Sequence, residues 1–365
     1  MSDKESKQKL STEPYKGVRD FYPDDMAVEN YIFSVWRKTA ESFGYQEYGA
    51  SVLEPTELYK AKSGQEIINE QTYSFTDRGE RDVTLRPEMT PTVARMIAAK
   101  RKELRFPIRW YSIPNLFRYE KPQRGRLREF YQFNADIFGL DRMQADMEMV
   151  MLAYQIMKSF GLNDKQFEIR INVGVNATKQ DAETLMKKLA AVGIKNARFD
   201  EEIVRGMEYY TGITFEMYDT GKDNPRALFG GGRYDNLLDI FGEEKVPATG
   251  FGMGDVGIKN VLETYNLLPQ IPAPADLYLC PMSEKEIEYA EKLAQNIRDA
   301  GARVIVDYSG KKVGEQIKYA DKSRIPFVAV IGENETKTGT FKIKNLSSGT
   351  ETEATAKTAA SVILQ

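Results

Sequence analysis

The segment that decides the fold reads FRYEKPQRGRLREFYQFNADIF and runs from Phe117 to Phe138. Its last part, Glu129–Phe138, alternates with a period of two, which predicts a β-strand with two different faces. One face is apolar, with Tyr131, Phe133, Ala135 and Ile137, and the other holds Phe130, Gln132, Asn134, Asp136 and Phe138. Antiparallel sheets often turn a polar face to water. Two amides and a carboxylate between phenylalanines favour a walled polar pocket instead.

A basic loop joins this strand to the one before it. Arg118 precedes the loop 121–126 and Phe130 follows it. An arginine suits a phosphate and an aromatic ring suits a flat base. Between Arg95 and Arg128 there are eleven basic residues and two acids, although the chain as a whole has a net charge of −3. A polyanionic partner and an ordinary solvated surface explain this charge about equally well.

The composition excludes several kinds of chemistry. The chain has 365 residues, no histidine and one cysteine, Cys280. Catalytic triads with histidine, zinc sites with histidine ligands and internal disulfides are therefore excluded. Carboxylates, arginines, lysines, hydroxyls, backbone dipoles and hard cations remain available. The polar start and the lack of a long apolar run predict no signal peptide, no membrane span and a cytoplasmic location.

The chain is predicted to hold two domains. Residues 1–14 are expected to be a disordered tail, 15–265 an α+β domain with an antiparallel sheet, and 266–275 a linker with three prolines. Residues 276–365 alternate strands and helices, which predicts a small parallel α/β domain. The expected helices are 24–44, 91–102, 146–160, 181–192, 284–300 and 313–323. The expected strands are 46–53 (stopped by Pro55), 73–76, 82–85, 108–111, 115–120, 129–138, 167–173, 276–280, 304–307 and 327–331.

One glycine motif is a weak candidate for dinucleotide binding. Gly252–Gly257 has the spacing G-x-G-x-x-G, and Asp276 follows about 20 residues later. In a dinucleotide fold the acid ends the second strand, whereas Asp276 begins a strand after the proline linker. An oxidoreductase that binds nucleotide here is therefore disfavoured.

Five segments in order resemble the histidyl-tRNA synthetases, which are class II aminoacyl-tRNA synthetases. The resemblance begins at Gly17-Val18-Arg19-Asp20-Phe21. The segments are 24–55 (motif 1, which forms the homodimer), 84–90 (TLRPEMT), 117–130 (motif 2), 203–212 (IVRGMEYYTG) and 231–235 (GGRYD). Residues 276–365 resemble the anticodon-binding domain of this family. The resemblance implies an antiparallel class II catalytic core followed by this domain.

The resemblance also implies roles for individual residues. Glu88, Thr90 and Gln132 bind the α-ammonium of L-histidine, and Met89 is a further histidine-binding residue. Asp136 and Tyr210 contact the imidazole, and Tyr209 forms a wall. Arg118 binds the α-phosphate of ATP, Phe130 stacks on adenine and Glu120 lies near its edge. Arg205 bridges the carboxylate and the α-phosphate. Further implied contacts are Arg128 and Arg233 to ATP, and Lys121, Gln123, Arg124 and Arg126 to tRNA(His).

The implied reaction forms histidyl-adenylate from histidine and ATP with Mg²⁺, and then charges tRNA(His). Structural interpretations stay open: Arg118 and Arg205 as surface ion pairs, Tyr209 and Tyr210 as core aromatics, and Asp136 as an acid at a strand end. Two features depart from the family. Val256 and Gly257 stand where motif 3 has Glu-Arg, so a γ-phosphate contact is either missing or supplied by Lys259 or Arg233. The insertion domain is reduced to about 172–202. A regulatory paralogue without charging activity is the alternative.

Overall fold

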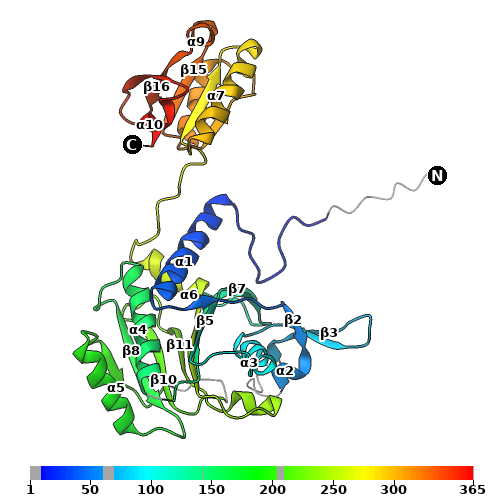
Figure 1. Cartoon of the computed structure of the whole chain (residues 1–365), viewed down its shortest axis with the longest axis vertical. Coiled ribbons are helices and arrows are strands. Elements are labelled where there is room, and N and C mark those ends of the chain that lie inside the picture. The colour runs from blue at the N-terminus through cyan, green and yellow to red at the C-terminus, as the bar shows by residue number, and fades with distance from the viewer. Residues whose placement is uncertain (1–9, 61–69, 142, 204–208, 365) are drawn as a thin grey trace, which may run out of the picture. The chain divides into compact units, whose positions relative to one another are not determined.

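The computed structural model describes residues 10–60, 70–141, 143–203 and 209–364. The chain divides into two compact units, Met1–Pro269 and Gln270–Gln365, and the boundary falls inside the predicted linker (Figure 1). In the first unit the elements are α1 (Pro23–Ser42), β1 (Gln46–Glu47), β2 (Leu53–Pro55), α2 (Thr56–Lys60), β3 (Tyr73–Thr76), β4 (Asp82–Leu85), α3 (Thr90–Ala99), β5 (Ile108–Ser112), β6 (Asn115–Phe117), β7 (Glu129–Phe138), α4 (Met143–Ser159), β8 (Phe167–Val173), α5 (Lys179–Ala191), β9 (Ala197–Phe199), β10 (Ile213–Asp219), β11 (Ala227–Arg233), η2 (Leu237–Phe241), β12 (Ala248–Gly254) and α6 (Asp255–Thr264).

A nine-stranded sheet forms the centre of the first unit. Its order is β1-β5-β7-β12-β11-β10-β8-β9, with β6 paired to β7. The pairs β1–β5 and β8–β9 are parallel and the others are antiparallel. The expected antiparallel core is confirmed. Helix α5 and strand β9 lie within residues 172–202, where the sequence predicts a shortened insertion.

The two faces of this sheet differ. Helices α1, α4 and α6 contact one face, where Phe133 packs against Trp36, Tyr111 and Phe251 at ring distances of 5.7–5.8 Å. The alternation along β7 turns Gln132 and Asp136 to the opposite face. We call this second face the site face, because the polar clusters described below lie on it.

The predicted strand 46–53 is wrong in its extent. Residues 46–47 pair with β5 in the large sheet, whereas Leu53–Pro55 joins a separate three-stranded sheet with the order β2-β4-β3. Pro55 does not stop this strand, because it pairs with Val83 at the end of β2, an edge strand. Proline is tolerated there, since its missing N–H breaks no ladder in the sheet interior.

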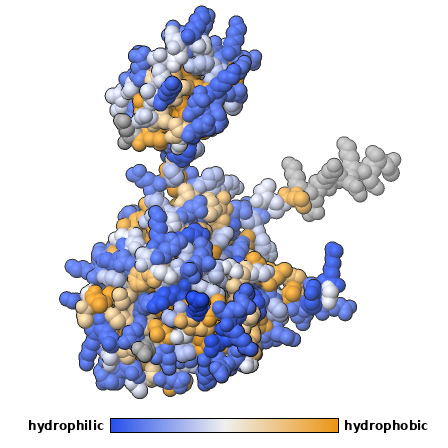
Figure 2. All heavy atoms as spheres, in the orientation of Figure 1, coloured by the Kyte–Doolittle hydropathy of each residue, from blue (hydrophilic) through white to orange (hydrophobic). Residues whose placement is uncertain are grey.

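The three-stranded sheet has one apolar face. Opposed residues in register share a face of a sheet, and the register aligns Leu53 with Leu85 and Tyr73, and Pro55 with Val83 and Phe75. We call these six residues the apolar hairpin face. Leu53 is 45% exposed and Phe75 is 50% exposed. The visible face of the molecule is mostly hydrophilic, with hydrophobic patches on both units (Figure 2).

The second unit is a mixed sheet between two small cores. Its elements are β13 (Leu277–Pro281), η3 (Glu284–Glu286), α7 (Ile287–Asp299), β14 (Val304–Val306), α8 (Val313–Lys322), β15 (Phe327–Ile331), α9 (Glu333–Thr338), β16 (Thr340–Asn345), β17 (Glu351–Thr355) and α10 (Ala359–Ile363). Strands β14, β13 and β15 are parallel, as expected. Strands β16 and β17 add an antiparallel edge, so the prediction of a parallel sheet is incomplete.

The signal for β16 was available in the sequence. Buried Phe341 and Ile343 alternate with exposed Lys342 and Lys344, which is the pattern of a half-buried strand. The next strand, β17, buries only Ala354 and has no such apolar pattern. Among the residues described in the two units, no helix is both long and apolar enough to cross a membrane.

Candidate functional site

A cluster of tyrosines surrounds Asp136 on the site face. Asp136 lies on β7, is 4% exposed and accepts a hydrogen bond from the hydroxyl of Tyr234, which follows β11. The ring of Tyr234 packs edge-on against Tyr209 at 5.6 Å, and Tyr209 contacts Tyr210 at 4.9 Å. Burial raises the pKa of Asp136 to about 7, and the Tyr234 hydrogen bond opposes this rise.

The segment before α3 reaches the same cluster. The Tyr209 hydroxyl donates to Glu88 Oε2 at 3.1 Å and lies 3.4 Å from Thr90 Oγ1. Glu88 is 2% exposed and Met89 is 1% exposed, so both are buried in the protein. Residues from positions 88–90, 136, 209–210 and 234 therefore meet in one place. We call this cluster of side chains the tyrosine-walled pocket, after the histidine pocket that the sequence predicts here.

A glycine in β12 makes room for the Asp136 carboxylate. Gly250 pairs with Asp136 in the register of β12 and β7. A Cβ on Gly250 would lie 2.1 Å from Asp136 Oδ1, which is far closer than two atoms in contact allow. Further along the strand, a Cβ on Gly252 would lie 2.8 Å from the Gln132 side chain. The glycines of this strand thus leave space for polar side chains of β7.

A cavity of about 690 Å³ opens beside the pocket. Arg118, Glu120, Phe130 and Gln132 line it, and so do glycines whose lack of side chains leaves its floor open: Gly230, Gly252, Gly254 and Gly257. We call it the glycine-floored cavity. Gln132 lines it and lies on the same face of β7 as Asp136. The cavity and the tyrosine-walled pocket are therefore neighbours along β7.

Arg118 is held in position at the cavity wall. Its Nε donates to the Pro87 carbonyl at 2.9 Å, and its guanidinium carbon lies 5.5 Å from the centre of the Phe130 ring. Arg118 Nη1 is 3.9 Å from Glu120 Oε1. Pro87 precedes the acid of the tyrosine-walled pocket, so this hydrogen bond ties the two sites together.

The basic loop after Glu120 borders the cavity. Gln123, Arg124 and Arg126 line it, and the backbones of Gln123 and Arg126 exchange hydrogen bonds of 2.9 and 3.1 Å. Arg126 forms an ion pair of 3.4 Å with Glu120. Lys121 is exposed and is not among the lining residues. The tight turn thus keeps two cations at the cavity mouth.

Two arginines expected at ATP lie elsewhere. The Arg128 guanidinium lies 3.8 Å from the Tyr119 ring and donates to the carbonyls of Glu120 and Lys16. Arg233 lies on the helix-covered side of the sheet, where its Nη2 is 2.9 Å from Asp146 Oδ2 on α4. Neither residue lines the glycine-floored cavity. We therefore leave Arg128 and Arg233 out of the ATP site proposed below.

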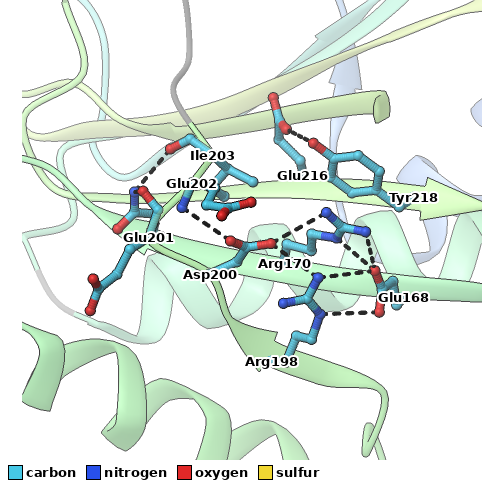
Figure 3. A network of polar contacts seen from close by, with 10 residues as sticks. Glu168, Arg170, Arg198, Asp200, Glu201, Glu202, Ile203, Glu216 and Tyr218 are labelled. Carbon is cyan, nitrogen blue, oxygen red and sulfur yellow. Dashed lines mark hydrogen bonds and ion pairs between the residues drawn. The ribbon is translucent and has the colours of Figure 1, made fainter. Parts of the chain in front are cut away.

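Arg205 lies outside the described residues, but the structure describes the segment that leads to it. Asn172 donates to the Ile203 carbonyl at 2.9 Å, and the Glu202 amide donates to Asp200 Oδ1 at 3.0 Å. Figure 3 shows how Asp200 joins Arg170, Arg198 and Glu168 in a network of ion pairs. This network fixes residues 200–203 against strands β8 and β9.

The same network reaches the cavity wall. Arg170 stacks on the Tyr218 ring at 3.7 Å, and the Tyr218 hydroxyl donates to Glu216 Oε2 at 2.7 Å (Figure 3). Glu216 lines the glycine-floored cavity. The sequence predicts no role for Glu216 or for Tyr234. Their position at a site depends on strand order, which local periodicity does not reveal.

A buried acid, Asp255, directly precedes Val256 and Gly257, the two residues that depart from motif 3. Asp255, the first residue of α6, is 0% exposed, pairs with Arg19 at 2.5 Å and accepts from the Tyr131 amide at 3.0 Å. It therefore ties α6 to β7 and to the N-terminal segment. The Gly252–Gly257 motif spans the end of β12 and the start of α6, and both neighbours of β12 are antiparallel. This arrangement is not the parallel βαβ unit of a dinucleotide fold.

Comparisons with known proteins agree with this geometry. The family model described as histidyl-tRNA synthetase matches residues 17–175 and 172–255, and the anticodon binding domain matches 276–365. The chain belongs to the histidyl-tRNA synthetase family. A histidine–tRNA ligase of Leptospira biflexa is 36% identical over 413 aligned positions, covering 93% of this chain and 94% of the relative. One from Thermoplasma volcanium is 34% identical, covering 93% and 95%.

Solved structures of the family share the fold. The apo S. aureus histidyl-tRNA synthetase has a TM-score of 0.85 and 27% identity, and covers 97% of this chain and 100% of its own. The class II fold with a C-terminal anticodon-binding domain is thus confirmed. The alignment with the Leptospira relative is longer than the 365 residues of this chain. It therefore includes positions of the relative that this chain lacks.

Proposed function

We propose that this chain activates L-histidine with ATP and transfers it to tRNA(His), with the tyrosine-walled pocket binding histidine and the glycine-floored cavity binding ATP. The observation that carries the assignment is the junction of the two sites along β7, where Gln132 and Asp136 share a face. Adenylate formation requires the amino-acid carboxylate and the α-phosphate to meet, so adjacent sites are necessary.

The tyrosine-walled pocket suits histidine. Glu88 supplies a negative charge, and Thr90 and Gln132 supply acceptors, for the α-ammonium group. Asp136 and Tyr210 contact the imidazole, and Tyr209 closes one side. Tyr234 holds the Asp136 carboxylate. A buried site that pairs with both ring nitrogens discriminates strongly against side chains that lack them, since its polar groups would be left without partners.

The glycine-floored cavity suits ATP. Phe130 stacks on adenine, with Glu120 near the polar edge of the base, and Arg118 binds the α-phosphate. An oxygen of the histidine carboxylate attacks the α-phosphorus, and the bond to the β-phosphate oxygen breaks to release pyrophosphate. The carboxylate is already ionised, so no protein base is needed. We assign Arg205 to the bridge between carboxylate and α-phosphate on the resemblance of 203–212 to the family signature.

Mg²⁺ is expected to enter with the triphosphate. Glu120 and Glu216 are carboxylates that line the cavity, and oxygen ligands of this kind fit a hard cation. Lys121, Gln123, Arg124 and Arg126 are proposed to contact the end of the tRNA, and residues 276–365 its anticodon. Because translation uses the product, we propose a cytoplasmic location.

A homodimer through motif 1 is part of the proposal. The apolar hairpin face follows α1 and leaves Leu53 and Phe75 about half exposed. Exposed apolar faces of this kind usually mark an interface. We expect Phe75→Asp to convert the dimer to a monomer in sedimentation velocity, while Lys187→Asp, on the exposed surface of α5 and outside motif 1, stays dimeric. A wild-type monomer at micromolar concentration would contradict the proposed dimer.

The central test is histidine-dependent exchange of pyrophosphate into ATP. The wild-type chain is expected to exchange, and Arg118→Ala to lose more than about 100-fold in kcat/KM, because charge-assisted contacts to the reacting phosphate vanish. Arg303→Ala is the matched control, since Arg303 pairs with Asp276 in the second unit and does not line the cavity. Folded protein that binds histidine without exchange would favour the regulatory alternative.

A further inference from the structure

We propose that Arg226 is the residue that binds the β- and γ-phosphates of ATP in this chain. The inference rests on the proposed ATP site and adds a residue to it. Arg226 lies just before β11 and lines the glycine-floored cavity. Arg226 belongs to none of the sequence motifs, and the family resemblance implies no role for it.

The position of Arg226 is at the outer part of the cavity. The segment 223–228 lines the cavity together with Val256, Gly257 and Asn260 of α6. The Leu228 carbonyl lies 3.4 Å from where a Cβ of Gly257 would stand, so the start of β11 runs directly beside the first turn of α6. Arg226 is two residues before this contact. The Arg226 side chain therefore begins close to Gly257, a residue that has no side chain.

The basic loop approaches the same first turns of α6. A Cβ on Gly125 would lie 3.9 Å from the Asn260 side-chain nitrogen. The loop, α6 and the segment 223–228 thus frame one opening. With the α-phosphate of ATP at Arg118, the β- and γ-phosphates extend toward this opening.

The charges of the cavity single out Arg226. Arg118 already bonds Pro87 and faces Phe130, and Arg126 pairs with Glu120. Arg226 has no hydrogen bond or ion pair to any residue in the described parts of the chain, and neither does Arg124 on the loop. Asp223 also lines the cavity, and among the described residues no ion pair joins it to Arg226.

The two cations considered from the sequence are already paired. Arg233 is buried against Asp146 and Asp235, on the opposite side of the sheet. Lys259 Nζ is 3.9 Å from Asp25, and Lys259 does not line the cavity. Of the two cavity arginines without a protein partner in the described ranges, Arg226 is the one that directly precedes a β-strand, β11. A guanidinium binds two phosphate oxygens in a fork. Positive charge there also stabilises the departing pyrophosphate.

The test measures pyrophosphate exchange with Arg226→Ala and Arg226→Lys in the full chain. We expect Arg226→Ala to raise the ATP KM by about 10- to 100-fold, the range of a charge-assisted contact, and to leave the histidine KM within about twofold. Arg226→Lys should fall between, because a lysine keeps the charge but not the fork. Lys222→Ala, an exposed cation of the same segment outside the cavity lining, should behave as wild type.

Nucleotide binding adds a second readout. By calorimetry Arg226→Ala should weaken ATP by the same factor and leave AMP unchanged, since AMP lacks the β- and γ-phosphates. Equal losses for ATP and AMP, or an unchanged ATP affinity, would overturn the inference. The Arg118→Ala variant separates the two proposals. If Arg118→Ala abolishes exchange and Arg226→Ala does not alter it, only the role of Arg226 fails. If neither matters, the proposed ATP site fails.

Discussion

The two ends of the site face of β7 are built in opposite ways. At the Asp136 end, buried carboxylates are bonded to tyrosine hydroxyls, and three aromatic rings pack against each other. At the Phe130 end, glycines form the floor and charged side chains reach in from loops. One strand thus connects a closed pocket to an open cavity.

This difference matches what each substrate requires. A small side chain is distinguished from others by a rigid pocket whose polar groups demand partners. A triphosphate that must react and leave needs space, cations and a route outward. We therefore expect changes at the closed end to affect histidine and stability, and changes at the open end to affect ATP alone.

Two glycine substitutions on β12 give the largest contrast. Gly250→Ala places a Cβ 2.1 Å from the Asp136 carboxylate, whereas Gly254→Ala meets nothing within 4 Å. We expect Gly250→Ala to lose more than about 100-fold in exchange activity and about 1–3 kcal/mol of unfolding free energy, as overpacked cores do. Gly254→Ala should keep wild-type stability in urea denaturation and change only the ATP KM. Equal effects of Gly250→Ala and Gly254→Ala would contradict the proposed difference between the two ends of β7.

Removing one hydroxyl tests the closed end alone. Tyr234→Phe deletes the donor to the buried Asp136 carboxylate and leaves the ring in place. We expect the histidine KM to rise by roughly 10-fold, since a hydrogen bond to a charged group contributes about 1.5–3 kcal/mol. The ATP KM should stay constant in the same assay. Tyr22→Phe, which changes a 71% exposed residue, is the control. A parallel rise in both KM values would show that the two ends are not independent.

The pH dependence of stability gives the smallest expected effect. The pKa of Asp136 is about 7 in the folded chain, against about 4 when unfolded. The folded state therefore binds this proton more tightly, and stability falls as pH rises from about 4 to about 7. Glu29, whose pKa burial also raises to about 7, adds a change of the same sign.

Asp136→Asn removes one of these two titrations. We expect the loss of unfolding free energy between pH 5 and pH 7.5 to shrink by roughly 1–3 kcal/mol relative to wild type. Urea denaturation at several pH values measures this. An identical pH profile for the two proteins would mean that Asp136 does not carry the shifted pKa.

Much of the site was visible in the sequence because its residues lie in short, periodic segments. The alternation along 129–138 predicted the face that holds Gln132 and Asp136, and the structure confirms β7 over the same residues. The resemblance to a family supplied the roles. Arg128 and Arg233 do not line the cavity. The sequence does not show this, because an arginine in a motif does not reveal which side of its strand it faces or which acid it meets.

The sequence alone determined most of the elements, the two-domain division and the chemistry that is possible without histidine side chains. These follow from local composition and periodicity, which depend on neighbours along the chain. Only the tertiary structure decided that Tyr234 holds Asp136, that Gly250 makes room for that carboxylate, and that Arg226 borders the cavity. Strand order and register bring these residues together across more than 90 positions, and contacts at that separation leave no local pattern.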